Sequence, residues 1–236
     1  MSAALRMPVA ERPSASSARD ETILPRLLLI ADGFVSGRAG LAAEAVRERV
    51  ATLVAAGVRA VQLRDHAAEP EVYATAAAAL AVHLRTLHPD VVLVVNGRPD
   101  VARALGAVLH VGRRGPSVEQ ARRLLGDDAL LSYSAHSPSD ARRAADAGAD
   151  VLLVSPLFRT VSHPGVEPGE LHLLRRTCDA LAGVVPQPFV YALGGITPGH
   201  VADCLQAGAH GVAVLSGLLD AADPEEAARA YLGAFR

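Results

Sequence analysis

Lysine and tryptophan are absent from this chain of 236 residues, and aromatic residues make up only 3% of it. Without a lysine amine, the Schiff-base chemistry that many barrel aldolases use is excluded. The formal net charge is −2, so the chain also lacks the basic excess that is typical of a general nucleic-acid-binding protein.

The sequence also lacks any apolar run near the ~20 residues that a membrane span requires. Its two cysteines, Cys178 and Cys204, do not have the spacing of metal ligands, so we expect buried thiols in a reducing compartment. Residues 1–25 are polar and lack the apolar core of a secretory signal. We therefore expect a disordered tail over residues 1–25 and a single cytoplasmic domain over residues 26–236.

Eight short apolar runs alternate with helical patterns from Arg26 onward. The runs are nearly continuous in apolar residues, as expected for parallel strands that are buried on both faces. Between them, helical patterns begin at capping residues such as Ser117 and Ser137 or Ser139, and several end in glycine. Eight such units predict an α/β fold, a closed (β/α)₈ TIM barrel, with an open doubly wound sheet as the alternative. The expected strands are Leu27–Ala31, Val58–Arg64, Val91–Val95, Ala107–Val111, Ala129–Ser134, Asp150–Ser155, Pro188–Leu193 and Gly211–Ser216.

Two glycine-containing loops follow the last two expected strands. They read LGGITP, with Gly194 and Gly195, and VLSG, with Leu215 and Ser216. In a barrel of this kind, the loops after strands seven and eight form a recurrent phosphate site, and glycine lets backbone N–H groups approach a ligand closely. Either loop alone is equally well explained as a tight turn, but the two together favour phosphate binding.

Three further side chains are expected at the same end of the strands, which is where barrel active sites lie. His136 follows the fifth strand and is a candidate for proton transfer, although a histidine there can also serve only the loop. Arg64 ends the second strand, where it would bind a ligand anion or pair with Asp32 or Asp65. Asn96 would orient a ligand or make an Asx turn, and the two interpretations are equally good.

Seven motifs in order then resemble one known family. They are QLRD from Gln62, VVNGRPDVA from Val94, HVG from His110, SYSAHS from Ser132, ADVLLVSPLFRT from Ala149, ALGGITP from Ala192 and AGAHGVAVLSG from Ala207. The set resembles the thiamine phosphate synthase/TenI superfamily over Leu27 to about Phe235, and that superfamily folds as a (β/α)₈ barrel. Taken with the strand ends, the resemblance implies these substrate-binding residues: Gln62, Arg64, Asn96, Ser134, Thr160, Gly194, Gly195, Leu215 and Ser216.

The chain departs from the synthase branch of this superfamily, which joins a pyrimidine pyrophosphate to a thiazole phosphate with Mg²⁺. Both metal-binding aspartates of the synthase motifs are replaced, by Gly97 and Gly115. Both lysines that contact pyrophosphate are replaced, by His66 and His163. Because Mg²⁺ needs oxygen ligands, these four departures argue against the synthase reaction.

The departures instead resemble the TenI branch, the thiazole tautomerases. That resemblance implies an isomerase that aromatises a phosphorylated carboxythiazole by proton transfer, with His136 as the acid and base and with no metal or cofactor. The alternatives are a Mg²⁺-dependent thiamine phosphate synthase and a non-enzymatic regulator that binds thiamine intermediates. No nucleic acid or membrane partner is expected. The oligomeric state, a homo-oligomer included, and the roles of His66 and His163 are left open.

Overall fold

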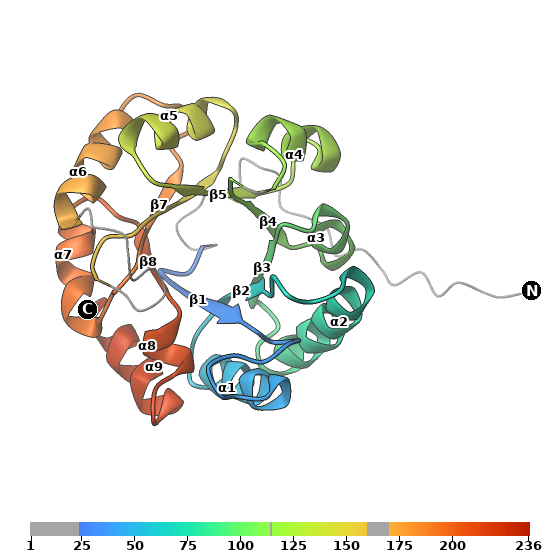
Figure 1. Ribbon diagram of the computed structural model, residues 1–236. Coiled ribbons are helices and arrows are strands. Elements are labelled where there is room, and N and C mark those ends of the chain that lie inside the picture. The colour runs from blue at the N-terminus through green and yellow to red at the C-terminus, as the bar shows by residue number, and fades with distance from the viewer. Residues whose placement is uncertain (1–23, 114, 160–169) are drawn as a thin grey trace, which may run out of the picture.

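The computed structural model describes residues 24–113, 115–159 and 170–236, and in them eight parallel strands close into a barrel (Figure 1). The strands pair in chain order, and β8 pairs with β1 to complete the ring. The predicted closed barrel is therefore confirmed, and the alternative of an open sheet is excluded. The strands are β1 Leu27–Asp32, β2 Ala60–Arg64, β3 Val92–Asn96, β4 Val108–Val111, β5 Leu131–Ala135, β6 Val151–Val154, β7 Phe189–Leu193 and β8 Gly211–Val214.

The helices form a ring outside the strands, as Figure 1 shows. Ser117 and Gln120 form the expected capping box at the start of α4, and the side chain of Ser137, not Ser139, caps α5. The expected eighth strand was too long, because Ser216 begins helix α8. The helical elements are α1 Ala43–Ala55, α2 Pro70–Leu87, α3 Pro99–Leu105, α4 Val118–Leu125, α5 Pro138–Asp146, α6 Glu170–Ala180, η1 Pro198–His200, α7 Val201–Gln206, α8 Ser216–Leu219 and α9 Pro224–Gly233.

Alternation of side chains along the strands divides the apolar core into two layers. Residues such as Leu29 and Leu63 point outward and pack against the helices. Their neighbours, such as Leu28 and Ile30, point into the barrel, where they meet Tyr191 and other inward-facing side chains. The interior of the barrel is thus a packed core, and a ligand can enter only at the end where the inward-facing residues stop being apolar.

The other end of the barrel is closed by the residues just before β1. The hydroxyl of Tyr191 donates to the carbonyl of Pro25 at 2.7 Å, and Nε2 of His210 bonds to the carbonyl of Leu24 at 2.8 Å. Leu24 and Pro25, which we expected to belong to the tail, therefore pack against the barrel, while residues 1–23 lie outside the described part of the chain. None of the described helices has the length and hydropathy needed to cross a membrane.

A buried ion pair fastens helix α4 to the strands behind it. Nη2 of Arg122 lies 2.9 Å from Oδ2 of Asp150, and the same carboxylate oxygen accepts the N–H of Leu131 at 2.9 Å. Only 4% of the Asp150 side chain is exposed. Removing this carboxylate leaves the N–H of Leu131 without its acceptor and takes the counter-charge from Arg122, whose guanidinium keeps only backbone carbonyl acceptors.

We predict that Asp150→Ala lowers the free energy of unfolding by about 3 kcal/mol, because one partner of a buried pair is lost. Urea denaturation of the purified variant measures this change. Asp146→Ala is the matched control: it removes a carboxylate from the exposed pair with Arg142, and we expect a change of no more than about 0.5 kcal/mol. Equal losses in the two variants would contradict the interpretation.

Candidate active site at the mouth of the barrel

The mouth of the barrel has a polar half and an apolar half. Inward-facing positions near the carboxyl ends of β2 to β6 are polar, namely Gln62, Arg64, Asn96, His110, Ser132, Ser134 and Ser155. The corresponding positions on β7, β8 and β1 carry the aliphatic side chains of Leu193, Ala213, Leu215 and Ile30, and β1 then ends in Asp32, beside Arg64. A ligand with one apolar ring and several polar groups would match this division.

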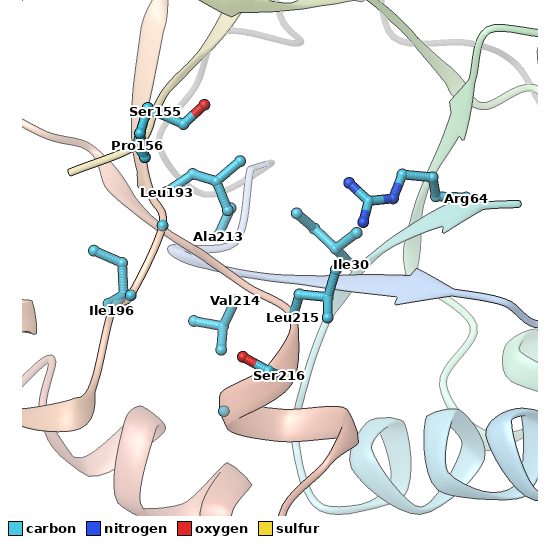
Figure 2. A pocket seen from close by; sticks show the side chains of 13 residues that line it. Ile30, Arg64, Ser155, Pro156, Leu193, Ile196, Ala213, Val214, Leu215 and Ser216 are labelled. Atoms are coloured by element: carbon cyan, nitrogen blue, oxygen red, sulfur yellow. The ribbon is translucent and has the colours of Figure 1, made fainter. Parts of the chain in front are cut away.

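A pocket with an empty volume of about 520 Å³, part of it open to solvent, lies over the apolar half. Its walls come from the loops after β7 and β8, and Arg64 extends into it from β2 (Figure 2). Five of the residues that we expected to bind substrate line this one pocket: Arg64, Gly194, Gly195, Leu215 and Ser216.

Backbone N–H groups on the two loops are available to a ligand in this pocket. Among the described residues, no backbone carbonyl pairs with the N–H of Gly195, Ser216 or Gly217. Gly195 and Ser216 are half-buried and Gly217 is exposed, so solvent or a ligand can reach these donors. A group of such donors beside a guanidinium favours an anion with several acceptor oxygens. Phosphate has this chemistry.

The glycines of these loops have a second role that the sequence did not reveal. A Cβ on Gly195, whose φ is +65°, would lie 2.4 Å from the carbonyl oxygen of Arg159. A Cβ on Gly217 would lie 2.2 Å from the hydroxyl of Tyr231. Both positions therefore require glycine because neighbouring protein atoms occupy the space, whether or not a ligand is bound.

The first residues after β6 pack onto the β7 loop. The N–H of Leu157 donates to the carbonyl of Leu193 at 3.0 Å, and the N–H of Phe158 donates to that of Gly194 at 2.9 Å. The ring of Phe158 stacks on His200 with centroids 4.0 Å apart. These contacts hold the glycine loop against the segment after β6, whose Ser155 and Pro156 also line the pocket.

Arg64 combines the two roles that the sequence left open. Its Nε donates to Oδ1 of Asp32 at 2.8 Å, and Asp32 also accepts from Arg38 at 3.2 Å. Arg38 in turn pairs with Asp220 at 2.8 Å, which ties this cluster to the end of α8. The guanidinium of Arg64 is thus held through one nitrogen, while its end faces the pocket in Figure 2.

Asp65 has a structural role instead. Its carboxylate accepts the N–H groups of Val35, Ser36 and Ala67 and the hydroxyl of Ser36, at 2.8 to 3.2 Å. Burial alone would raise the pKa of this carboxyl group, but these hydrogen bonds outweigh it and hold the pKa below its usual value. Asp65 therefore joins the loops after β1 and β2. Its neighbour His66 is exposed and does not line the pocket.

His136, the expected acid and base, lies at the edge of the mouth and is exposed. Its Nδ1 is 2.8 Å from the carbonyl oxygen of Ser155. Because a carbonyl only accepts, Nδ1 carries the hydrogen and Nε2 of the neutral ring is left as an acceptor. His136 does not line the pocket, but Ser155 does, so the two are adjacent.

His110 is the titratable group that sequence reasoning passed over as a functional residue. Its Nδ1 lies 2.8 Å from Oγ of Ser132, and its Nε2 lies 2.9 Å from Oγ of Ser134. Burial and, to a smaller degree, the charge of Arg64 lower the pKa of His110 to about 3. The available signal was a histidine at an inward-facing strand position opposite two serines spaced two residues apart. Nearby, Nε2 of Gln62 is buried without a partner among the described residues.

The residues present do not fit the Mg²⁺ site that the synthase branch implies. Gly97 and Gly115 stand where that branch has aspartates, and the described residues contain no group of three or more metal-ligating side chains. Asp32 and Asp65 are already bonded to Arg64 and to backbone N–H groups, respectively. Two expected residues, Thr160 and His163, lie outside the described residues.

Comparison with known proteins gives consistent matches. The family model described as "Thiamine monophosphate synthase" (TMP-TENI) matches residues 34–218. A thiamine-phosphate synthase of Thermus thermophilus is 37% identical over 211 residues, which cover 88% of this chain and 96% of that protein. The thiamine biosynthesis bifunctional protein ThiM/ThiE of Symbiobacterium thermophilum is 39% identical over 183 residues, 77% of this chain but only 37% of that larger protein.

A solved structure supports the fold independently. The thiamine phosphate pyrophosphorylase from Pyrococcus furiosus superposes with a TM-score of 0.71 over 89% of this chain and 94% of that one, at 24% identity. At that identity the likeness concerns the fold alone, and it agrees with the closed barrel described above.

The expectation of an isomerase was wrong. The relatives that match most of this chain are named thiamine-phosphate synthases, which are transferases, and they give no support to a thiazole tautomerase. That expectation rested on four departures, the two replaced aspartates and the two replaced lysines. Those are changes at single positions, whereas the similarity to the synthases extends over most of the barrel.

Tyr231 of helix α9 holds both sides of the pocket. Its hydroxyl donates to the carbonyl of Ile196 at 2.8 Å and also packs under Gly217. Burial raises the pKa of Tyr231 to about 12, so the hydroxyl keeps its proton.

We predict that Tyr231→Phe weakens the binding of inorganic phosphate several-fold and lowers the free energy of unfolding by about 1 kcal/mol, the value of one hydrogen bond. Isothermal titration calorimetry and urea denaturation measure the two effects.

Tyr191→Phe is the matched control for this prediction. Tyr191 donates a comparable hydrogen bond, but to Pro25 at the opposite end of the barrel. We expect a similar loss of stability with unchanged phosphate affinity. If both variants bind phosphate as the wild type does, Tyr231 does not position the loops.

Proposed function

The chain belongs to the thiamine monophosphate synthase family, and from that premise we propose that it is a transferase that joins a phosphorylated thiazole to a pyrimidine pyrophosphate. The products would be thiamine phosphate and pyrophosphate. The observation that carries the proposal is the similarity to named synthases across nearly the whole barrel, together with a pocket suited to phosphate at the mouth.

The thiazole phosphate fits the apolar half of the mouth. Its phosphate would accept from the N–H groups of Gly195, Ser216 and Gly217, while its ring would contact the aliphatic side chains of Ile30 and Leu215. Because these donors are fixed by neighbouring protein atoms before a ligand arrives, little ordering is needed on binding. The phosphate would act as the anchor that places the ring.

The pyrimidine pyrophosphate would then lie over the polar half. Gln62, Asn96 and Ser134 supply amide and hydroxyl groups there, which suits a heterocycle with ring nitrogens and an amine. Arg64 lies between the two halves, where its guanidinium would stabilise the negative charge on a departing pyrophosphate. Holding both reactants side by side is the main contribution that such a site can make.

No step of this proposal depends on a bound metal ion, because the described residues do not fit one. The same observation supports a second candidate function, a protein that binds phosphorylated thiamine intermediates without joining them. Gly97 and Gly115 favour it, since a pyrophosphate without charge-neutralising partners is bound weakly. The two candidates share the phosphate pocket and differ only in turnover.

We predict that the purified protein forms thiamine phosphate when both phosphorylated substrates are mixed, with chromatography as the assay. The mixture is tested with Mg²⁺ and with a chelator, since the substrates themselves can carry the cation. Arg64→Ala should lower kcat/KM at least about tenfold, because a hydrogen bond to a charged group is lost in the transition state.

Arg142→Ala serves as the control, because Arg142 lies on the outer helix α5 and pairs only with exposed or backbone groups in the described structure. Its activity should equal that of the wild type. If no product forms under either condition while thiazole phosphate still binds in calorimetry, the transferase proposal fails and the binding protein replaces it.

A further inference from the structure

The hydrogen-bonded chain Ser132–His110–Ser134 runs from the interior of the barrel to its mouth. Ser132 is 1% exposed and His110 is 5% exposed, whereas Ser134, one pleat further along β5, is only partly buried. Tyr133, which lies between the two serines, and Ala135, which follows Ser134, belong to the outer core layer. Because side chains alternate along a strand, both serines face inward. Ser134 is thus the member of the chain that a ligand can reach.

The ring of His110 has no conformational choice in this arrangement. Both of its nitrogens lie within 2.9 Å of a serine hydroxyl, so a rotation of the ring would break two buried hydrogen bonds. A neutral imidazole has one N–H and one lone pair. Whichever nitrogen carries the hydrogen, the other must accept a hydroxyl proton, so the three groups form a chain whose direction is set by the tautomer of His110.

This direction decides what Ser134 presents to a ligand. If Nε2 donates to Oγ of Ser134, the serine hydrogen is free to point into the mouth as a donor. If Nε2 accepts, the serine hydrogen is used and only its lone pairs face the ligand. A serine without His110 would rotate freely between these states, and the ligand would have to order it at an entropic cost.

We propose that His110 is a positioning residue, which acts through Ser134 by fixing the orientation of its hydroxyl toward the bound substrate. The kinetic part of this inference rests on the proposed transferase function, in which Ser134 contacts the pyrimidine substrate. His110 itself does not touch substrate. It stays neutral because burial and the nearby charge of Arg64 both oppose a proton, which lowers its pKa.

The first test needs no substrate. In ¹⁵N-labelled protein, the His110 signals, identified by their loss in His110→Asn, should show one protonated and one unprotonated nitrogen without titration between about pH 5 and pH 9. Ser134→Ala should shift the Nε2 signal. Two results would overturn the proposal: a titration midpoint of His110 inside this pH range, or a chemical shift of Nε2 that is unchanged in Ser134→Ala.

The second test is a double-mutant cycle on kcat/KM for the pyrimidine pyrophosphate. Ser134→Ala and His110→Asn should each lower kcat/KM about tenfold, as expected for a lost buried hydrogen bond. The double variant should be no worse than Ser134→Ala alone, since His110 acts only through that serine. If the two single-variant losses of kcat/KM multiply in the double variant, His110 acts independently of Ser134 and the proposal is refuted.

A conservative variant separates positioning from simple structural support. The side-chain amide of glutamine, which can present either its N–H or its oxygen, reaches the place of Nε2, whereas that of asparagine reaches only the place of Nδ1. His110→Gln should therefore keep kcat/KM within about threefold of the wild type, even if it unfolds at the same temperature as His110→Asn. Equal values of kcat/KM for His110→Gln and His110→Asn would contradict the positioning role of His110. His210→Asn, a change at the opposite end of the barrel, controls for the loss of a packed histidine and should leave kcat/KM unchanged.

Failure of the transferase proposal would be recognised separately. If the wild type makes no thiamine phosphate, the same cycle is measured on the dissociation constant of the pyrimidine pyrophosphate by calorimetry. The NMR test stands in either case, because it reports on His110 and Ser134 in the free protein. A neutral His110 coupled to Ser134 in an inactive protein would leave this inference intact and reject only the function.

Discussion

Closure of the eight-stranded sheet is the constraint on which the site depends. In a closed barrel, every second side chain of each strand points at the same axis, so the last inward-facing residues of eight strands meet within one small area. Gln62, His110 and Leu215 are far apart in the sequence and share the mouth only because β8 pairs with β1. Without that pairing, the loops after β7 and β8 would lie at one edge of an open sheet, and Arg64 would not reach the pocket between them.

The closed barrel also makes polar residues at the inner positions costly unless they are bonded. His110 and the two serines satisfy one another, and Arg64 has Asp32 as its partner. Gln62 differs, because its Nε2 is buried without an acceptor among the described residues. An unsatisfied buried donor costs about 1–3 kcal/mol, and an acceptor atom on a ligand would recover that cost. Within the polar half, His110, its two serines and Arg64 thus have hydrogen-bond partners in the protein. Nε2 of Gln62 lacks one, and we expect a ligand acceptor there.

The eight strands could be predicted because burial on both faces leaves a long apolar run, which is a local signal. The cap Ser117 could be predicted for a similar reason, since a helix cap bonds only three residues ahead. For the next helix the sequence allowed either Ser137 or Ser139, and the structure selects Ser137. The supports of the site have no such signal. Tyr231 holds a carbonyl 35 residues away, and Asp65 holds loop atoms 29 and 30 residues away. Only the folded chain reveals that these residues meet.

The glycines show how a correct location can be reached by an incomplete argument. We expected Gly195 and Ser216 at a phosphate pocket, and the structure brings both to one pocket. The reason offered was close approach of a ligand, yet Gly195 and Gly217 are also required by Arg159 and Tyr231. The same glycines therefore serve both packing and ligand binding. The loops can present their N–H groups to an anion only if neighbouring residues, such as Arg159 and Tyr231, hold the loop backbone in place.

The missing carboxylates have a narrower meaning than the one that led us to an isomerase. Gly97 and Gly115 remove two carboxylates that could ligate a cation, but they do not determine which bond the protein makes. The proposed phosphate site in the pocket does not determine it either, since any reaction of a phosphorylated thiazole would use the same anchor. Gln62, Asn96 and Ser134 lie on the polar half, outside the pocket over the apolar half. In the proposed transferase this polar surface would bind the second reactant, a requirement that an isomerase with one substrate does not have.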